Sequence, residues 1–80
     1  GRARYYWRRH VDIAGLLEAQ DGKCFYCGAT LGNKFDRDHK IPRSRGGLDT
    51  LENACLACCH CNRSKRGMTD SEFLATRGVA

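Results

Sequence analysis

Apolar residues recur at three- and four-residue spacing near the start of the chain and predict a helix over residues 8–20. The apolar stripe consists of Val11, Ile13, Ala14, Leu16 and Leu17. An α-helix carries positions with this spacing on one face, which can then pack against a core. Asp21 and Gly22 follow the stripe, and a glycine there can take the left-handed conformation that ends a helix. We interpret this helix as scaffold.

Residues then alternate in character over 35–41, which predicts a β-strand. One side carries Phe35, Arg37, His39 and Ile41, and the other carries Asp36, Asp38 and Lys40. Because Asp38 and His39 are neighbours, a regular strand would aim them at opposite faces. Both can serve one site only where the strand ends or twists, and Pro42 favours such an end.

A second strand is predicted over residues 51–57. Between the two strands lies a turn-rich loop over residues 43–50, which contains Gly46 and Gly47. A connection of this length allows the second strand to pair back on the first, so we expect an antiparallel hairpin.

The hairpin is followed by two predicted helices. A short one spans residues 58–66, with Gly67 past its end. Thr69 and Glu72 have the spacing of a capping box, which begins a final helix of about two turns. The expected fold class is therefore α+β, a hairpin plus a helix with flanking N- and C-terminal helices.

With 80 residues, the chain is expected to form a single domain over residues 1–80. We divide it into a basic and aromatic arm over residues 1–10 and a core over residues 11–77. A chain this short buries only about two-thirds of its unfolded surface, so its core usually needs a crosslink or a bound metal. Because the chain begins at Gly1 without Met, we expect it to be part of a larger polypeptide.

The formal net charge is +5, from 14 Lys and Arg against 9 Asp and Glu, which favours nucleic acid as the partner. The arm interleaves four Arg with three aromatic residues. Such an arm can stack on bases and pair with phosphates. The alternative, slightly favoured, is that its aromatic residues pack on the domain. No apolar run approaches the roughly 20 residues that span a bilayer, so no membrane contact is expected.

Six cysteines suggest how so small a core is held together. No apolar signal segment precedes the first cysteine, which disfavours a secreted disulfide scaffold and favours a reducing, cytoplasmic location. Two Cys-x-x-Cys pairs separated by a long insert are instead typical of a tetrahedral zinc site. The expected cofactor is one structural zinc ion.

Cys24 and Cys27 form the first pair of ligands, and the second pair has two possible registers. Either Cys55 and Cys58 or Cys58 and Cys61 would fit the spacing. We favour Cys58 and Cys61, because this choice leaves Cys55 as a small buried residue on the second strand.

A second, catalytic metal site is predicted from oxygen ligands. The Asp38 carboxylate and the Asn62 side-chain carbonyl are hard ligands that suit Mg²⁺ or Mn²⁺. His39 can be neutral near pH 7 and take a proton from water. Metal, imidazole and a basic loop together indicate hydrolysis of phosphodiester bonds.

The run from Asp38 to Gly47, then Asn53, then residues 58–65, resembles the HNH endonucleases of the ββα-metal fold, and the Cys24 pair resembles their zinc-bearing branch. The resemblance covers residues 13–75. It implies that His39 is the general base, that Asp38 and Asn62 hold the catalytic ion, and that Asn53 pins the loop bearing His39. Asn62 stands where the family name has His, which shifts the expected preference toward Mg²⁺ or Mn²⁺.

Cations near these residues are expected to meet the phosphates of DNA. They are Arg43, Arg45, Arg63, Lys65 and Arg66. Two functions are alternatives to a nuclease: a zinc-ribbon module that binds DNA without cutting it, and a zinc domain that serves protein interaction. Neither explains why Asp38, His39 and Asn62 are all present beside the cysteine pairs, so an endonuclease is the preferred interpretation.

Overall fold

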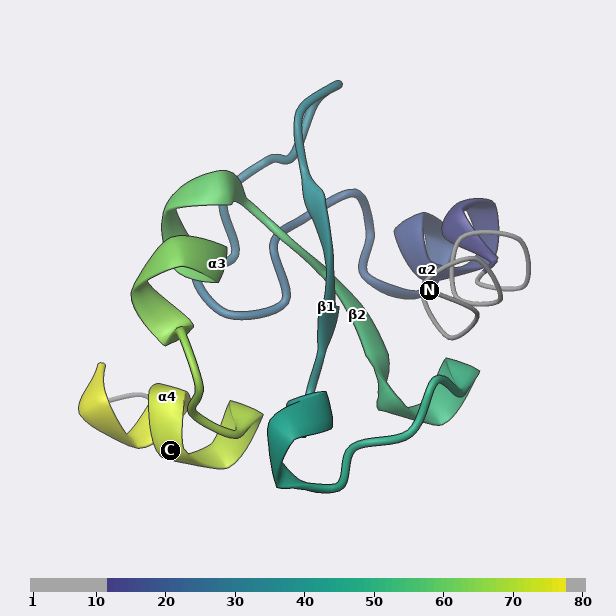
Figure 1. The fold of residues 1–80 in the computed structure, drawn as a ribbon. Coiled ribbons are helices and arrows are strands. Elements are labelled where there is room, and N and C mark those ends of the chain that lie inside the picture. Colours follow the sequence, from purple (N-terminus) through teal and green to yellow (C-terminus); the bar gives the residue numbers. More distant parts are fainter. Residues whose placement is uncertain (1–11, 78–80) are drawn as a thin grey trace.

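The computed structural model describes residues 12–77, which form a two-stranded hairpin flanked by short helices (Figure 1). The elements are α2 (Ile13–Ala19), β1 (Asp36–His39), β2 (Ala54–Ala57), α3 (Cys59–Lys65) and α4 (Asp70–Thr76). Short 3₁₀ helices, η1 (Arg43–Arg45) and η2 (Leu51–Asn53), lie between the strands. This arrangement confirms the predicted α+β fold, while the arm over residues 1–10 lies outside the described residues.

Strands β1 and β2 pair antiparallel, with Asp38 opposite Cys55 and His39 opposite Ala54. All of β2 is buried, whereas β1 is half-buried. Helix α3 contacts both strands and α2 contacts β2, so the two helices flank the hairpin (Figure 1). A two-stranded sheet is marginal alone, and this cover provides the burial that it needs.

The strands are shorter than the sequence pattern predicts. Residues 51–53 of the expected second strand form η2 instead, in which the backbone N–H of Asn53 donates to Thr50 O over 3.1 Å. Beyond His39, the backbone N–H and C=O of Ile41 bond to the Asn53 side chain rather than to a strand. The sheet therefore stops where the polar loop begins.

The outer edge of β2 is covered by a side chain from the end of α2. Gln20 Oε1 accepts from Leu56 N over 2.9 Å, and Gln20 Nε2 donates to Leu56 O over 2.9 Å. The helix that carries Gln20 begins at the cap Asp12, whose carboxylate accepts from Gly15 N. It ends before Asp21 and Gly22, which both have positive φ. The predicted start at residue 8 lies outside the described residues.

The two C-terminal helices also have well-defined ends. Helix α3 begins after the cap Cys58 and ends at Lys65, one residue inside each predicted bound. The predicted capping box before α4 is present, since Thr69 and Glu72 bond reciprocally. In the described part of the chain, none of the helices has the length and apolar character needed to cross a membrane.

The buried core lies between β2, α3 and α4. Its members include Tyr26, Leu31, Cys55, Leu56, Cys61 and Phe73. Tyr26 makes edge-on ring contacts with Phe25 and with Phe73, each at 5.1 Å between centroids. Few large apolar side chains are available to so short a chain, so an aromatic residue here contributes a large share of the buried area.

Candidate active site

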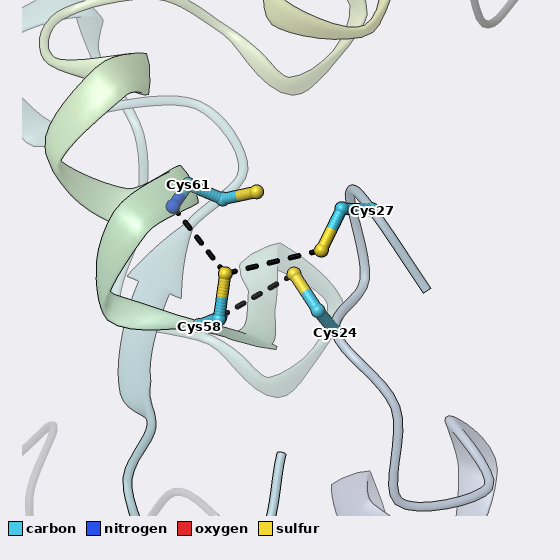
Figure 2. A group of neighbouring side chains, drawn as sticks. All are labelled: Cys24, Cys27, Cys58 and Cys61. Carbon is cyan, nitrogen blue, oxygen red and sulfur yellow. Dashed lines mark hydrogen bonds between the residues drawn. The ribbon is translucent and has the colours of Figure 1, made fainter. Parts of the chain in front are cut away.

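Four cysteine side chains from two distant segments meet at one end of the hairpin (Figure 2). Cys24 and Cys27 lie on the turn after α2, while Cys58 and Cys61 lie at the start of α3. Their sulfur atoms all lie within 4.8 Å of one another. Zinc bound by four thiolates at 2.3 Å requires sulfur atoms about 3.8 Å apart, so this cluster could hold zinc with little movement.

Backbone N–H groups donate to the sulfur atoms of Cys24 and Cys58, and those at Cys24 favour its thiolate form. Cys24 Sγ accepts from Tyr26 N at 3.4 Å and from Cys58 N at 3.3 Å. Burial alone would raise the pKa of Cys24, but these hydrogen bonds outweigh it and the pKa falls to about 7. A thiol with this pKa loses its proton readily to a metal ion.

Cys55 lies outside the cluster of four cysteines. Cys55 is 1% exposed on β2, and its sulfur lies 3.6 Å from Tyr26 Oη. Burial raises the pKa of Cys55 to about 12, so it remains a neutral thiol. Cys58 and Cys61 are therefore the cysteines that lie close to Cys24 and Cys27.

Asp38 lies against the core side of the hairpin, where donors converge on one of its oxygen atoms. Asp38 Oδ2 accepts from Tyr26 Oη at 2.5 Å and from Lys65 Nζ at 3.2 Å. Burial, and then the bond to Asp38, raises the pKa of Tyr26, so its hydroxyl remains a donor. The second carboxylate oxygen of Asp38 is the atom that these contacts leave available to a ligand.

His39 ends β1 and turns toward the loop. Its Nε2 lies 2.6 Å from Asp49 Oδ1, and both side chains are largely buried. Although Asp38 and His39 alternate along the strand, both line the same cavity, of about 380 Å³. The end of the strand at His39 therefore resolves the difficulty that the alternation raised.

The loop after His39 is organised by Asn53. Its side-chain Oδ1 accepts from Ile41 N at 2.9 Å, and its Nδ2 donates to Ile41 O at 3.0 Å and to Leu48 O at 2.9 Å. Gly47 passes so close to this segment that a Cβ atom would lie 1.7 Å from Ile41 O. Gly47 is thus required by a close approach of backbone to backbone, whereas Gly46 is favoured by its positive φ of 88°.

Asn62 lies on α3 over the strand β1. Its Nδ2 donates to Asp36 Oδ2 over 3.1 Å. Lys65, nearly one turn further along α3, pairs with Asp38, two residues along the strand. Asn62 and Asp38 thus share the interface of α3 with β1, but the side chain of Asn62 forms its hydrogen bond with Asp36 rather than with Asp38.

The cations predicted to contact DNA differ in position. Arg43 and Arg66 line the cavity beside Asp38 and His39, and Arg63 is exposed. Arg45 pairs with Glu72 at the start of α4, and this bond lowers the pKa of Glu72. Lys65 is 1% exposed, and its ammonium also donates to His39 O at 2.8 Å. A buried ammonium with internal partners cannot reach a phosphate, so Lys65 leaves the set of candidate DNA contacts.

Tyr26, Asp49 and Arg37 were not singled out from the sequence. Tyr26 lies between the two cysteines of the first Cys-x-x-Cys pair, and the spacing of that pair identifies only the cysteines as site residues. Asp49 reads as an ordinary turn residue, and only the fold brings it to His39. Arg37 lines the cavity together with His39. Because the two residues are two positions apart on β1, the alternation of the strand already predicts that they share a face.

The chain is similar in sequence to known endonucleases. The chain is 34% identical over 67 residues to the CRISPR-associated endonuclease Cas9 of Actinomyces naeslundii, which covers 81% of the chain and 6% of that protein. It is 35% identical over 51 residues to the Cas9 of Corynebacterium diphtheriae, covering 61% of the chain and 5% of that relative. The chain therefore spans only a small part of the length of these relatives.

A family model for HNH endonucleases matches residues 24–67. The matched segment begins at the first cysteine of the cluster and runs through both strands and α3 to Gly67. It thus contains the hairpin, the cysteine cluster, Asp38, His39 and Asn53. The chain belongs to the HNH endonuclease family.

Proposed function

We propose that this chain hydrolyses phosphodiester bonds of DNA with the help of a divalent ion. The observation that carries the proposal is the cavity of about 380 Å³ in which Asp38 and His39 lie beside the cations Arg37, Arg43 and Arg66. A carboxylate and an imidazole can serve the chemistry, while the guanidinium groups can hold phosphate oxygens. Membership of the HNH endonuclease family supports the same reaction class.

His39 acts as the general base in this proposal. It takes a proton from a water molecule, whose oxygen attacks phosphorus, and the bond from phosphorus to the 3′ oxygen breaks. The leaving oxygen then takes a proton from solvent. A general base in this position usually contributes a rate enhancement of roughly 10²–10⁴.

Asp38 and Asn62 would hold the divalent ion through oxygen atoms, which suits Mg²⁺ or Mn²⁺. When bound, the ion would supply positive charge next to the phosphate and the leaving oxygen. Tyr26 and Lys65 fix Asp38 Oδ2, which leaves the other oxygen for the ion. Asn62 belongs to the same interface of α3 with β1, and its side-chain oxygen would supply the second ligand.

The cysteine cluster would hold a structural zinc ion, because four thiolates complete a tetrahedral shell and leave no open position for a substrate. The bound zinc would fix the start of α3 to the turn before β1. This connection would position Asn62, which follows Cys61 on α3, and the turn whose Tyr26 contacts Asp38.

The charge of the chain supports DNA as the substrate, and its relatives support a larger polypeptide around it. A net charge of +5 and the cations at the cavity favour DNA. The similar proteins are named CRISPR-associated endonucleases, and the chain spans 6% and 5% of their lengths. We infer that the domain, which includes residues 11–77, works within a larger polypeptide that delivers it to DNA.

Cleavage of supercoiled plasmid in Mg²⁺ or Mn²⁺ tests the proposal. The wild-type chain should nick the plasmid, and His39→Ala should lower the rate by roughly 10²–10⁴. The matched control is His60→Ala, since His60 is an exposed histidine outside the cavity. Binding of DNA without any cleavage, in the presence of either ion, would support the zinc-ribbon binding module instead.

A further inference from the structure

We propose that Asp49 is a positioning residue for catalysis, which holds His39 in the tautomer with the proton on Nε2. The proposal rests on the proposed function, in which His39 is the general base. The two side chains form a pair across the loop between the strands. A carboxylate ten residues from the base along the chain thereby contributes to the reaction without contacting the substrate.

The contact has the geometry of an oriented hydrogen bond. Asp49 Oδ1 lies 2.6 Å from His39 Nε2. The side chains are 15% and 19% exposed, so little water competes for either partner. An ionised carboxylate only accepts hydrogen bonds, so the shared proton belongs to Nε2.

This assignment decides which nitrogen can act as the base. A neutral imidazole with its proton on Nε2 carries its lone pair on Nδ1. A carboxylate that fixes the tautomer and orientation of a catalytic histidine has the same role in serine proteases, where its loss lowers turnover strongly. We infer that Nδ1 of His39 is the atom that takes the proton from water.

The fold clamps the backbone on both sides of Asp49. The carbonyl of Leu48 accepts from Asn53 Nδ2 at 2.9 Å, and the carbonyl of Thr50 accepts from Asn53 N at 3.1 Å. Asn53 O also accepts from Lys40 N at 2.8 Å, directly after His39. Asn53 therefore fixes the backbone next to both Asp49 and His39.

A nearby cation adds to the orientation of Asp49. Arg43 Nε lies 3.9 Å from the same Oδ1 atom that contacts His39. The guanidinium attracts this oxygen atom and so helps to hold the Asp49 side chain in place beside the imidazole. The loop thus places an acceptor, rather than a donor, against Nε2.

The first measurement compares Asp49→Ala with wild type in the folded, zinc-loaded chain. We expect kcat for plasmid nicking to fall by roughly 10–100-fold, the usual effect of losing an outer partner of a site residue, while KM for DNA changes less than about twofold. Glu52→Ala is the matched control, because Glu52 is an exposed carboxylate three residues further along, in η2. If Asp49→Ala does not fold, Asp49→Asn keeps the size of the side chain and is measured in its place.

A double-mutant cycle separates positioning from a structural effect. In the His39→Ala background, Asp49→Ala should cause no further loss of kcat, because the residue through which it acts is already absent. An equal loss in both backgrounds would overturn the proposal, as would an Asp49→Ala chain with wild-type kcat.

The ¹⁵N chemical shifts of the His39 ring report the tautomer directly. Wild type should show the proton on Nε2, and Asp49→Ala should show a mixture of both tautomers. An unchanged tautomer in Asp49→Ala would overturn the proposal whatever the kinetics. If His39→Ala cleaves as fast as wild type, the proposed function fails, and the ¹⁵N spectra still establish whether Asp49 sets the tautomer.

Discussion

Tyr26 donates its hydroxyl to Asp38 over 2.5 Å, which joins the cysteine turn directly to a carboxylate of the candidate active site. Tyr26 lies between Cys24 and Cys27, so the backbone that carries these two thiols also carries the donor. Its ring is buried against Phe73. The position of Asp38 therefore depends on the turn that the cysteine cluster holds.

Tyr26→Phe tests this dependence, since it removes one oxygen atom and keeps the ring contacts. We expect the Mg²⁺ concentration for half-maximal nicking to rise by roughly tenfold, because Asp38 loses an outer partner that orients it. Zinc content, measured alongside, should equal that of wild type. An unaltered Mg²⁺ dependence would show that Lys65 alone is enough to orient Asp38.

Removal of one thiol from the cluster should unfold the chain. Cys58→Ser takes away a sulfur that lies 3.9 Å from Cys27 Sγ and also caps α3. Because a structural zinc site supplies much of the folding free energy of a small domain, both zinc and the far-ultraviolet signal of helix should be lost. Cys59→Ser is the matched control, as Cys59 lies outside the cluster, and it should retain both. A folded Cys58→Ser chain that keeps zinc would contradict the assignment.

Lys65 and Arg66 are neighbours in sequence that should respond differently to substitution. Lys65→Met leaves the nearly buried Asp38 without its cation and should lower the free energy of unfolding by about 3 kcal/mol. Arg66→Met changes an exposed residue and should alter it by less than about 0.5 kcal/mol. Urea unfolding of both variants makes the comparison.

Arg66→Met also tests whether Arg66, unlike the buried Lys65, contacts DNA. Arg66→Met should weaken DNA binding at low salt and reduce the slope of log affinity against log salt by about 1, as expected when one phosphate contact is lost. A slope equal to that of wild type would place Arg66 outside the DNA interface.

The sequence predicts the local elements and the cysteine cluster well, because each depends on spacing along the chain. Two Cys-x-x-Cys pairs, an alternating strand and a capping box all carry their signal within a few residues. Cys58 and Cys61 lie with the first pair, as their spacing favours, while Cys55 is buried on β2 away from them.

The contacts across the fold were not predictable in this way. Asp49 meets His39, and Tyr26 meets Asp38, only because the loop and the cysteine turn fold onto the hairpin. Lys65 was expected to contact DNA, together with its neighbours Arg63 and Arg66 near the end of α3. Its position four residues after Cys61 places it on the same buried face of α3, and this spacing was the missed signal.

The last prediction separates the roles of His39 and Asn62 by their dependence on metal. If His39 is the base, His39→Ala leaves both proposed oxygen ligands in place, so the Mg²⁺ concentration for half-maximal activity should stay the same while turnover falls by roughly 10²–10⁴. If Asn62 is a ligand, Asn62→Ala should instead raise that concentration. It also removes the bond to Asp36, so thermal unfolding must accompany the assay.

Asn62→Asp and Asn62→His make the assignment specific. Asp restores a hard oxygen ligand and should recover turnover with Mg²⁺, whereas His offers nitrogen and should recover it better with Mn²⁺ or softer ions. Asp36→Ala is the matched control, since it removes the bond between Asp36 and Asn62 but keeps the amide oxygen of Asn62. Titration of Mg²⁺ and Mn²⁺ against the nicking rate compares all these variants. Asn62 is not a ligand if Asn62→Ala and Asp36→Ala show the same metal dependence, because the loss would then come from their shared hydrogen bond.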